Sequence, residues 1–146
     1  MIRVKKLREK AKIPFRATPG SAGADLFACL DDPITIMPKQ TILVPTGLAM
    51  EIPSGYVGLV FARSGLATKQ DLAPANKVAV IDADYRGEWL VPLHNHGNQM
   101  RIITPDERIA QMVVVPCLAD SFEVVDELSD TERGAGGFGS TGIKGE

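Results

Sequence analysis

The sequence predicts an all-β protein with the architecture of an antiparallel sandwich, jelly roll or barrel. Short segments rich in β-branched and apolar residues recur along the chain, and turn residues separate them. Helical periodicity is weak in comparison, and no internal repeat is present. Strands at this spacing are typical of antiparallel all-β folds.

The expected strands occupy residues 40–44, 56–61, 77–81, 89–91 and 109–115. Proline, glycine and asparagine mark turns at residues 52–55, 96–98 and 104–106. One short helix is expected over residues 64–70, with the Ser64 hydroxyl as its N-cap. These elements form one main domain.

Size and charge exclude several classes of protein. A chain of 146 residues with 45% hydrophobic content can bury the core of one domain. No apolar run approaches the ~20 residues of a membrane span, and no apolar stretch follows the charged N-terminus, so we expect a soluble cytoplasmic protein without a membrane partner. Cys29 and Cys117 lie in apolar stretches typical of buried free thiols. With a net charge of -2, the chain is not expected to bind nucleic acid.

The C-terminal segment differs from the rest of the chain. We divide the chain into a β-domain over residues 1–130 and a flexible glycine-rich arm over residues 131–146, because six of the 14 glycines follow residue 133. A frayed tail is one interpretation. The isolated ring of Phe138, with Arg133, Ser140 and Thr141 beside it, favours a lid that closes on a phosphorylated planar ligand. The G-x-G-x-x-G pattern at 134–139 is rejected as a dinucleotide fingerprint, because no helix can follow it.

Two internal segments are candidates for phosphate chemistry. An expected strand ends at Arg63, and Ser64 and Gly65 open the short helix. The exposed backbone N–H groups at such a helix start favour anions. The alternative is a routine turn with a solvated arginine. Residues 80–88 form a hairpin with a charged end, where Asp82 follows an apolar strand. Solvated turn residues are common there, but a strand can also hold such an aspartate rigidly as a general base.

Four further residues are ambiguous when taken singly. Asp25 could serve a metal or lie in a turn, and Gln111 could bind a ligand or only satisfy neighbouring backbone. His94 and His96 alternate along an expected strand edge, so their rings should point to opposite faces and make poor joint metal ligands. We assign the histidines no function.

Five segments, taken in order, resemble the five motifs of the trimeric dUTPase family: residues 17–26, 63–67, 81–88, 108–111 and 133–142. The resemblance extends from about residue 5 to residue 142. It implies a jelly-roll-like β-barrel, a homotrimer with a site at each subunit interface, Mg²⁺ as cofactor and dUTP as substrate. The arm would close the active site of a neighbouring subunit.

The resemblance also implies roles for individual residues. Asp82 matches the catalytic aspartate, and Tyr85 matches the residue that stacks on the deoxyribose and excludes a 2′-hydroxyl. Asp25 matches a carboxylate that holds Mg²⁺ through water, with the metal held mainly by the triphosphate. The residues that match uracil contacts are Asn76, Val80, Ile81, Asp82, Leu90 and Phe138. Those that match phosphate contacts are Arg63, Ser64, Gly65 and Gln111, and those that match the γ-phosphate clamp are Arg133, Ser140 and Thr141. Gly139 is expected to bind substrate beside them.

The implied activity is hydrolysis of dUTP to dUMP and pyrophosphate by an Asp82-activated water, which keeps uracil out of DNA and supplies dUMP for thymidylate synthesis. Two positions depart from the family pattern, since Ala79 and Asp106 stand where many members carry glycine. One alternative is dCTP deaminase, which shares the fold but needs a glutamate where Pro92 stands. The other is a non-enzymatic β-sandwich binding module, which would have no use for Arg133 and Phe138.

Overall fold

Short antiparallel strands make up most of the protein in a computed structural model that describes residues 1–138. One helix of seven residues, α1 (Ser64–Gln70), interrupts them, and within the described range no helix is long and apolar enough to cross a membrane. The strands are β1 (Arg3–Lys6), β2 (Ala24–Phe27), β3 (Ile34–Ile36), β4 (Thr41–Pro45), β5 (Leu48–Glu51), β6 (Tyr56–Phe61), β7 (Leu72–Pro74), β8 (Ala79–Ile81), β9 (Leu90–Asn95), β10 (Arg101–Ile103) and β11 (Arg108–Pro116).

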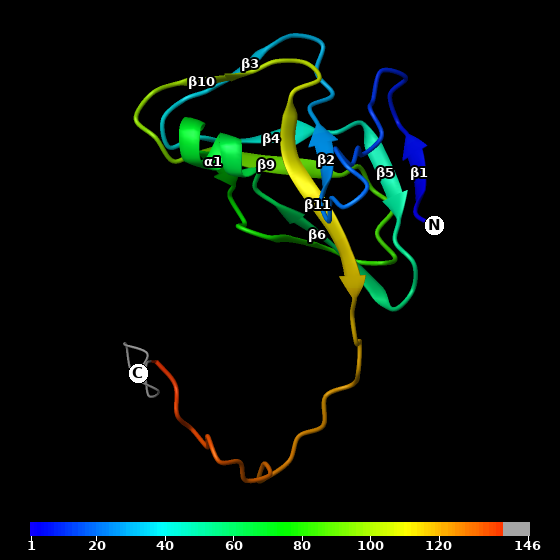
Figure 1. Cartoon of the computed structure of the whole chain (residues 1–146), viewed down its shortest axis with the longest axis vertical. Helices are drawn as coiled ribbons and strands as arrows, with labels where there is room; N and C mark the ends of the chain where they lie inside the picture. Colours follow the sequence, from blue (N-terminus) through cyan, green and yellow to red (C-terminus); the bar gives the residue numbers. More distant parts are fainter. Residues whose placement is uncertain (139–146) are drawn as a thin grey trace.

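Two larger sheets carry the architecture. One has the strand order β2-β11-β6-β8 and the other β4-β9-β7, while β1 pairs with β5 and β3 with β10. Every pairing is antiparallel. Figure 1 shows β11 as the long yellow strand that crosses the body of the molecule beside β2 and β6. The prediction of an all-β, jelly-roll-like fold is confirmed.

The core lies between these sheets and follows the alternation of the strands. In β9, Val91, Leu93 and Asn95 are buried while Leu90, Pro92 and His94 face outward. The same core contains Trp89, which is 2% exposed. Other core side chains that are almost fully buried are Leu26, Ile36, Val44, Ile103 and Ile109. The alternation thereby presents Leu90 to the outside, next to the buried tryptophan.

The expected strands coincide with β4, β6, β8, β9 and β11, within a few residues at their ends. Shorter strands were not predicted, because three or four residues give too little alternation to recognise. In β5, Leu48, Ala49 and Met50 are all buried, so this strand lacks the two-residue pattern altogether.

The helix begins where the sequence indicates but is capped differently. Arg63 is the N-cap residue, with extended backbone angles and no side-chain capping bond. The prediction that the Ser64 hydroxyl is the cap was wrong, because Ser64 is itself the first helical residue. Its hydroxyl is therefore not used as a cap.

Two expectations about individual side chains were also wrong: the orientation of the two histidine rings and the burial of Cys117. The rings of His94 and His96 do not point to opposite faces but lie edge-to-face, with centroids 4.4 Å apart. Strand β9 ends at Asn95, so His96 belongs to the following turn and the alternation no longer holds there. Cys29 is a buried free thiol as expected, whereas the free thiol of Cys117 is exposed just beyond the end of β11.

After β11 the chain leaves the barrel. Residues 117–138 run away from the body as an extended segment, coloured orange to red in Figure 1, and contain no helix or strand. Large apolar side chains along it are exposed, including Phe122 and Val124 at about full exposure. Such a row of uncovered apolar groups is unusual for a monomeric surface. The proposed boundary at residue 130 stays a prediction, although the last strand ends at Pro116.

Candidate active site

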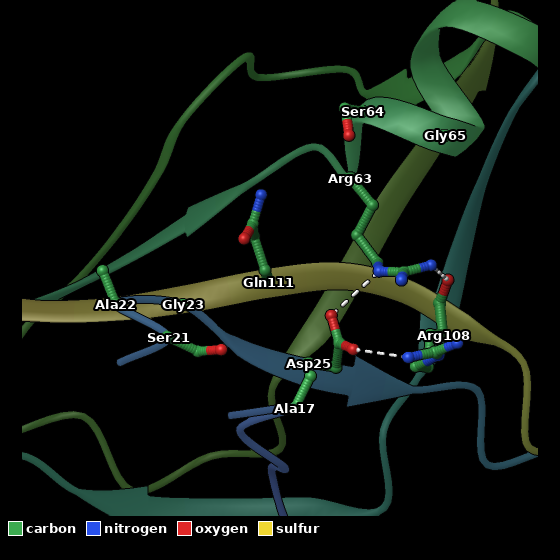
Figure 2. Close-up of a pocket in the computed structure, with 10 residues that line it drawn as sticks. All are labelled: Ala17, Ser21, Ala22, Gly23, Asp25, Arg63, Ser64, Gly65, Arg108 and Gln111. Carbon is green, nitrogen blue, oxygen red and sulfur yellow. Dashed lines mark hydrogen bonds and ion pairs between the residues drawn. The ribbon is translucent and has the colours of Figure 1, made fainter. Parts of the chain in front are cut away.

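A hollow of about 330 Å³ opens beside the helix, where β6 ends and where β2 and β11 begin (Figure 2). Three separate motifs of the sequence meet there. Strand β2 and the loop before it contribute Asp25 and small residues, the β6–α1 junction contributes Arg63, and β11 contributes Arg108 and Gln111. The complete lining is Ala17, Ser21, Ala22, Gly23, Asp25, Arg63, Ser64, Gly65, Arg108 and Gln111.

Asp25 lies between two arginines. Its Oδ1 accepts a hydrogen bond from Arg63 Nε at 2.8 Å, and its Oδ2 from Arg108 Nη1 at 3.2 Å. The Asp25 side chain is only 13% exposed, so the ion pairs are partly shielded from water. Two guanidinium groups against one carboxylate leave this group with a net charge of +1, which favours an anionic ligand.

Gln111 serves the backbone and still faces the hollow. Its Nε2 donates to the carbonyl of Ala62 at 2.9 Å, as one sequence interpretation expected. A carboxamide nitrogen has two hydrogens, so one remains for a ligand. The Gln111 amide lies directly over Gly23, where a Cβ would come 3.2 Å from its Cδ. A larger residue at this position would force the Gln111 amide to move.

A second hollow of about 240 Å³ lies at the connection between β8 and β9. The expected hairpin was wrong, because β8 pairs with β6 while β9 pairs with β4 and β7, so the two strands lie in different sheets. Strand β8 leads into Asp82, and the turn that follows is closed by a hydrogen bond from the Tyr85 amide to the Asp82 carbonyl at 3.2 Å. Arg86 Nη1 braces the same turn by donating to the carbonyls of Ala83 and Tyr85. The lining residues are Val80, Ile81, Asp82, Tyr85, Glu88, Trp89 and Leu90.

Ala79 and Val80 lie on opposite sides of β8. The methyl group of Ala79 is buried in the core, whereas Val80 is 63% exposed at the hollow. The departure from glycine at position 79 therefore adds a methyl group to the core. Asp106, the other departure, has a left-handed φ of 66° in the turn before β11. Such an angle suits glycine best and aspartate next.

The two hollows share no residue and lie far apart on one chain. Strands β11 and β6 separate β2 from β8, which gives a width of about 14 Å at ~4.8 Å per strand spacing. Asp25 is level with Phe61, while Ile81 is level with Gly58, three residues further along β6. That adds about 10 Å along the strand, so roughly 17 Å of sheet separates Asp25 from Ile81.

The remaining predicted residues lie outside both hollows. Asn76 is exposed in the turn between β7 and β8. Within residues 1–138, the Arg133 side chain donates only to the carbonyl of Gly136, and Phe138 is fully exposed on the extended segment. Gly139, Ser140 and Thr141 lie beyond the described residues. The described part of the arm, residues 131–138, therefore lies away from Asp82 and Arg63 of the same chain.

The lining residues that received no individual role from the sequence are Ala17, Ser21, Ala22, Gly23, Arg108, Glu88 and Trp89. Arg108 opens one of the five motifs, so its position was a usable signal. Glu88 ends the third motif and Trp89 follows it, but nothing local in the sequence indicates which way a residue just before a strand will face.

The fold and the two hollows define a class of protein. It is an all-β barrel in which one hollow is lined by arginines and serines and a separate hollow is lined mainly by apolar side chains. The dUTPase family profile matches residues 9–142. A deoxyuridine 5'-triphosphate nucleotidohydrolase of Desulfitobacterium hafniense (strain DSM 10664 / DCB-2) is 54% identical over 138 residues, covering 93% of this chain and 91% of the relative. Its counterpart in Hahella chejuensis (strain KCTC 2396) is 48% identical, covering 96% and 93%. The chain belongs to the dUTPase family.

Solved structures agree with this assignment. A variant of the Staphylococcus bacteriophage 80alpha dUTPase with dUpNHpp superposes with a TM-score of 0.85 at 29% identity, covering 98% of this chain and 99% of that one. A variant of the dUTPase from phage phi11 of S. aureus, described with a structural Mg(II) ion, superposes with a TM-score of 0.81 at 25% identity, covering 89% and 99%.

Proposed function

We propose that the protein hydrolyses dUTP to dUMP and pyrophosphate. The observation that carries the proposal is the pairing of an arginine-flanked hollow, suited to phosphate, with a second hollow that ends in Asp82 and Tyr85. Relatives with 48–54% identity are named for this activity, and a structurally similar phage dUTPase holds dUpNHpp. The reaction needs an anion site and an acceptor that orients water, and these hollows supply one each.

The phosphate side follows from the first hollow. Arg63 and Arg108 present positive charge around a shielded carboxylate, while Gln111 retains one free N–H. With Ser64 and Gly65, these groups would bind the triphosphate and offset the negative charge that builds on the leaving pyrophosphate. Arg133, Ser140 and Thr141 are expected to hold the γ-phosphate end.

Asp82 is proposed to orient the attacking water. An ionised carboxylate is a weak base, so its main contribution would be to fix the water in line with the α-phosphorus and the pyrophosphate oxygen. A new oxygen–phosphorus bond then forms at the α-position as the bond to the β-phosphate oxygen breaks. The rigid end of β8 supports this role, because it limits the positions that the carboxylate can reach.

Tyr85 and the backbone of β8 are proposed to select the nucleoside. The Tyr85 ring borders the second hollow and would stack on the deoxyribose, leaving no space for a 2′-hydroxyl. The backbone around Val80 and Ile81, with Asn76, would read the uracil edge, and Leu90 would close the pocket. Phe138 would cover the base after the arm has moved to it.

Mg²⁺ is the cofactor that fits these residues. Both oxygens of Asp25 are engaged by arginines, which disfavours direct metal coordination but leaves lone pairs for metal-bound water. Among residues 1–138, no group of three or more histidine, cysteine, aspartate or glutamate side chains could hold a metal ion. Mg²⁺ would therefore be held mainly by triphosphate oxygens and, through water, by Asp25. It would supply charge neutralisation on the phosphates.

A homotrimer with shared sites would resolve the distance between the hollows. A water held by Asp82 must lie within about 3 Å of the α-phosphorus, whereas on one chain roughly 17 Å of sheet separates Asp25 in the first hollow from Ile81, next to Asp82, in the second. The exposed apolar groups of residues 117–138 support the same proposal, since packing on a neighbouring copy would cover them. Each site would then combine two hollows and an arm from different subunits.

The proposed setting is the cytoplasm, where the reaction would keep uracil out of DNA and supply dUMP for thymidylate synthesis. Two free thiols are in keeping with a reducing compartment.

Incubation with dUTP and Mg²⁺ in ¹⁸O-water tests the activity and the position of attack together. We expect equal amounts of dUMP and pyrophosphate, with the label in dUMP. Label in pyrophosphate would contradict attack on the α-phosphorus, and absence of both products from folded protein would overturn the proposal.

dCTP deaminase remains the rival enzyme of the same fold. Pro92 stands on β9 opposite Leu43, in the position where that chemistry requires a glutamate, and proline cannot transfer a proton. Ammonia release from dCTP at a rate comparable to dUTP hydrolysis would favour the rival.

A further inference from the structure

The hydroxyl end of the Tyr85 ring is fixed by the backbone of the β8–β9 connection, to which Tyr85 itself belongs. Its hydroxyl donates to the carbonyl oxygen of Glu88 at 3.0 Å. The ring also lies over Gly87, where a Cβ would come 2.9 Å from the ring carbon Cε2. Any larger residue at position 87 would push the ring away. The orientation of Tyr85 therefore depends on where the Glu88 carbonyl is held.

That carbonyl belongs to a peptide unit bonded on both sides. The N–H of the same unit, on Trp89, donates to the carbonyl of Leu48 at 2.8 Å. On the preceding side, the Glu88 carboxylate accepts the backbone N–H of Gly47 at 2.8 Å, in a partly buried position. The Glu88 side chain thus holds the residues just before β9 to the β4–β5 turn. The backbone N–H of Trp89 holds the next peptide unit to Leu48.

The β4–β5 turn is a rigid anchor. Gly47 has a left-handed φ of 70°, and a Cβ there would lie 2.7 Å from Cys29 Sγ and 2.8 Å from the methyl carbon of Ala11. Its carbonyl accepts the N–H of Leu7 at 2.8 Å. Ala11 and Cys29 form a small buried cluster with Leu48. Glycine is required at this turn, and its N–H points from a fixed position.

We propose that Glu88 is a positioning residue that sets sugar selectivity, because it holds the carbonyl on which the Tyr85 hydroxyl rests. The inference rests on the proposed function and deepens it, since Tyr85 is the proposed 2′-discriminator. Without the Glu88 carboxylate, the Gly47 N–H loses its acceptor and the 87–88 backbone can shift. The Tyr85 ring then gains freedom beside the sugar, and a 2′-hydroxyl becomes better tolerated.

The test compares kcat/KM for dUTP and UTP in four single variants. Glu88→Ala removes the acceptor, Glu88→Gln retains an acceptor oxygen, and Tyr85→Phe removes only the hydroxyl. Gln40→Ala is the matched control, since its side-chain oxygen accepts the Met37 N–H at 2.8 Å in a turn remote from both hollows. We expect the UTP/dUTP ratio to rise at least about fivefold in Glu88→Ala and in Tyr85→Phe.

The ratio should stay within about twofold of wild type in Glu88→Gln and Gln40→Ala. The double variant Glu88→Ala/Tyr85→Phe should resemble the stronger single variant, since both changes break one linkage. A wild-type ratio in folded Glu88→Ala, or a ratio in Glu88→Gln as high as in Glu88→Ala, would overturn the proposal.

If Glu88→Ala does not fold, Tyr85→Phe decides alone, because a wild-type ratio there means that the hydroxyl–carbonyl bond carries no selectivity. Failure of the proposed function is distinct, since wild-type protein would then release no pyrophosphate from dUTP. Trp89 is the single tryptophan of the chain and belongs to the same peptide unit. Its fluorescence emission therefore monitors whether the β8–β9 connection keeps its conformation in each variant.

Discussion

Asp82 is the residue on which the proposed chemistry depends most. Replacing it with asparagine keeps the size of the side chain but removes its negative charge and one of its two acceptor oxygens, so the side chain can no longer take a proton from the water. We expect Asp82→Asn to lower kcat by about 10²-fold or more, with much less change in nucleotide affinity. Steady-state kinetics together with equilibrium binding of a non-hydrolysable dUTP analogue checks both. An unchanged kcat would remove Asp82 from the mechanism.

Tyr85 makes the second prediction at this scale. Replacing it with alanine removes the ring beside the sugar and leaves the arginines of the phosphate hollow untouched. The UTP/dUTP ratio of kcat/KM should rise by about tenfold or more in Tyr85→Ala. If this ratio equals that of wild type in a correctly folded variant, Tyr85 does not discriminate the sugar.

Single residues of the site were predictable from the sequence to differing degrees. Arg63, Ser64, Gly65, Asp25 and Gln111 meet in one hollow, as their motifs indicate. The ion pairs of Asp25 were not predictable, because they depend on strands β2 and β11 lying side by side. For the same reason, the contact from Glu88 to Gly47, 41 positions apart in the chain, leaves no local pattern.

The turn before β11 shows how one element accommodates an unusual residue. Asp106 has a φ of 66° and pairs with Lys12 at 3.0 Å. Asp106→Gly and Asp106→Ala both lose that ion pair, but only alanine keeps a Cβ in the left-handed conformation. We expect the glycine variant to exceed the alanine variant by about 1 kcal/mol in free energy of unfolding.

Urea unfolding at one fixed protein concentration measures this difference, and the concentration matters for any oligomer. Equal stability of the two variants would mean that the turn relaxes to another conformation when its aspartate is lost.

A strand could be predicted from the sequence where it is long enough for apolar and polar side chains to alternate along it. β6 and β11 follow the expected ranges, whereas β5 is buried on both faces and carries no such signal. The His94–His96 contact escaped prediction because the strand ends between the two residues. Alternation along a chain is thus informative only while the strand continues.

At the scale of the molecule, the barrel presents the two hollows of the proposed reaction near opposite edges of one sheet. An extended segment with exposed apolar side chains follows the last strand. The sequence indicates the arm through its glycines, but no single-chain property tells which copy it covers. That question concerns the assembly and calls for an experiment on mixed oligomers.

Two inactive variants separate the possibilities. One carries Asp82→Asn with an intact arm, and the other keeps Asp82 but ends at residue 132. Neither forms a homotrimer in which an intact Asp82 meets an intact arm. A mixed trimer contains two copies of one variant and one copy of the other. If the sites are shared, either composition creates one junction at which an intact Asp82 meets the intact arm of a neighbouring subunit.

The decisive measurement is pyrophosphate release from dUTP after the two variants are denatured together and refolded, with heterotrimers verified by native mass spectrometry. We predict that the mixture recovers activity that neither variant shows alone, at a level that follows the fraction of mixed trimers. If each chain closed its arm over its own Asp82, no subunit in any mixture would have both parts. Verified heterotrimers with no activity would contradict the shared site.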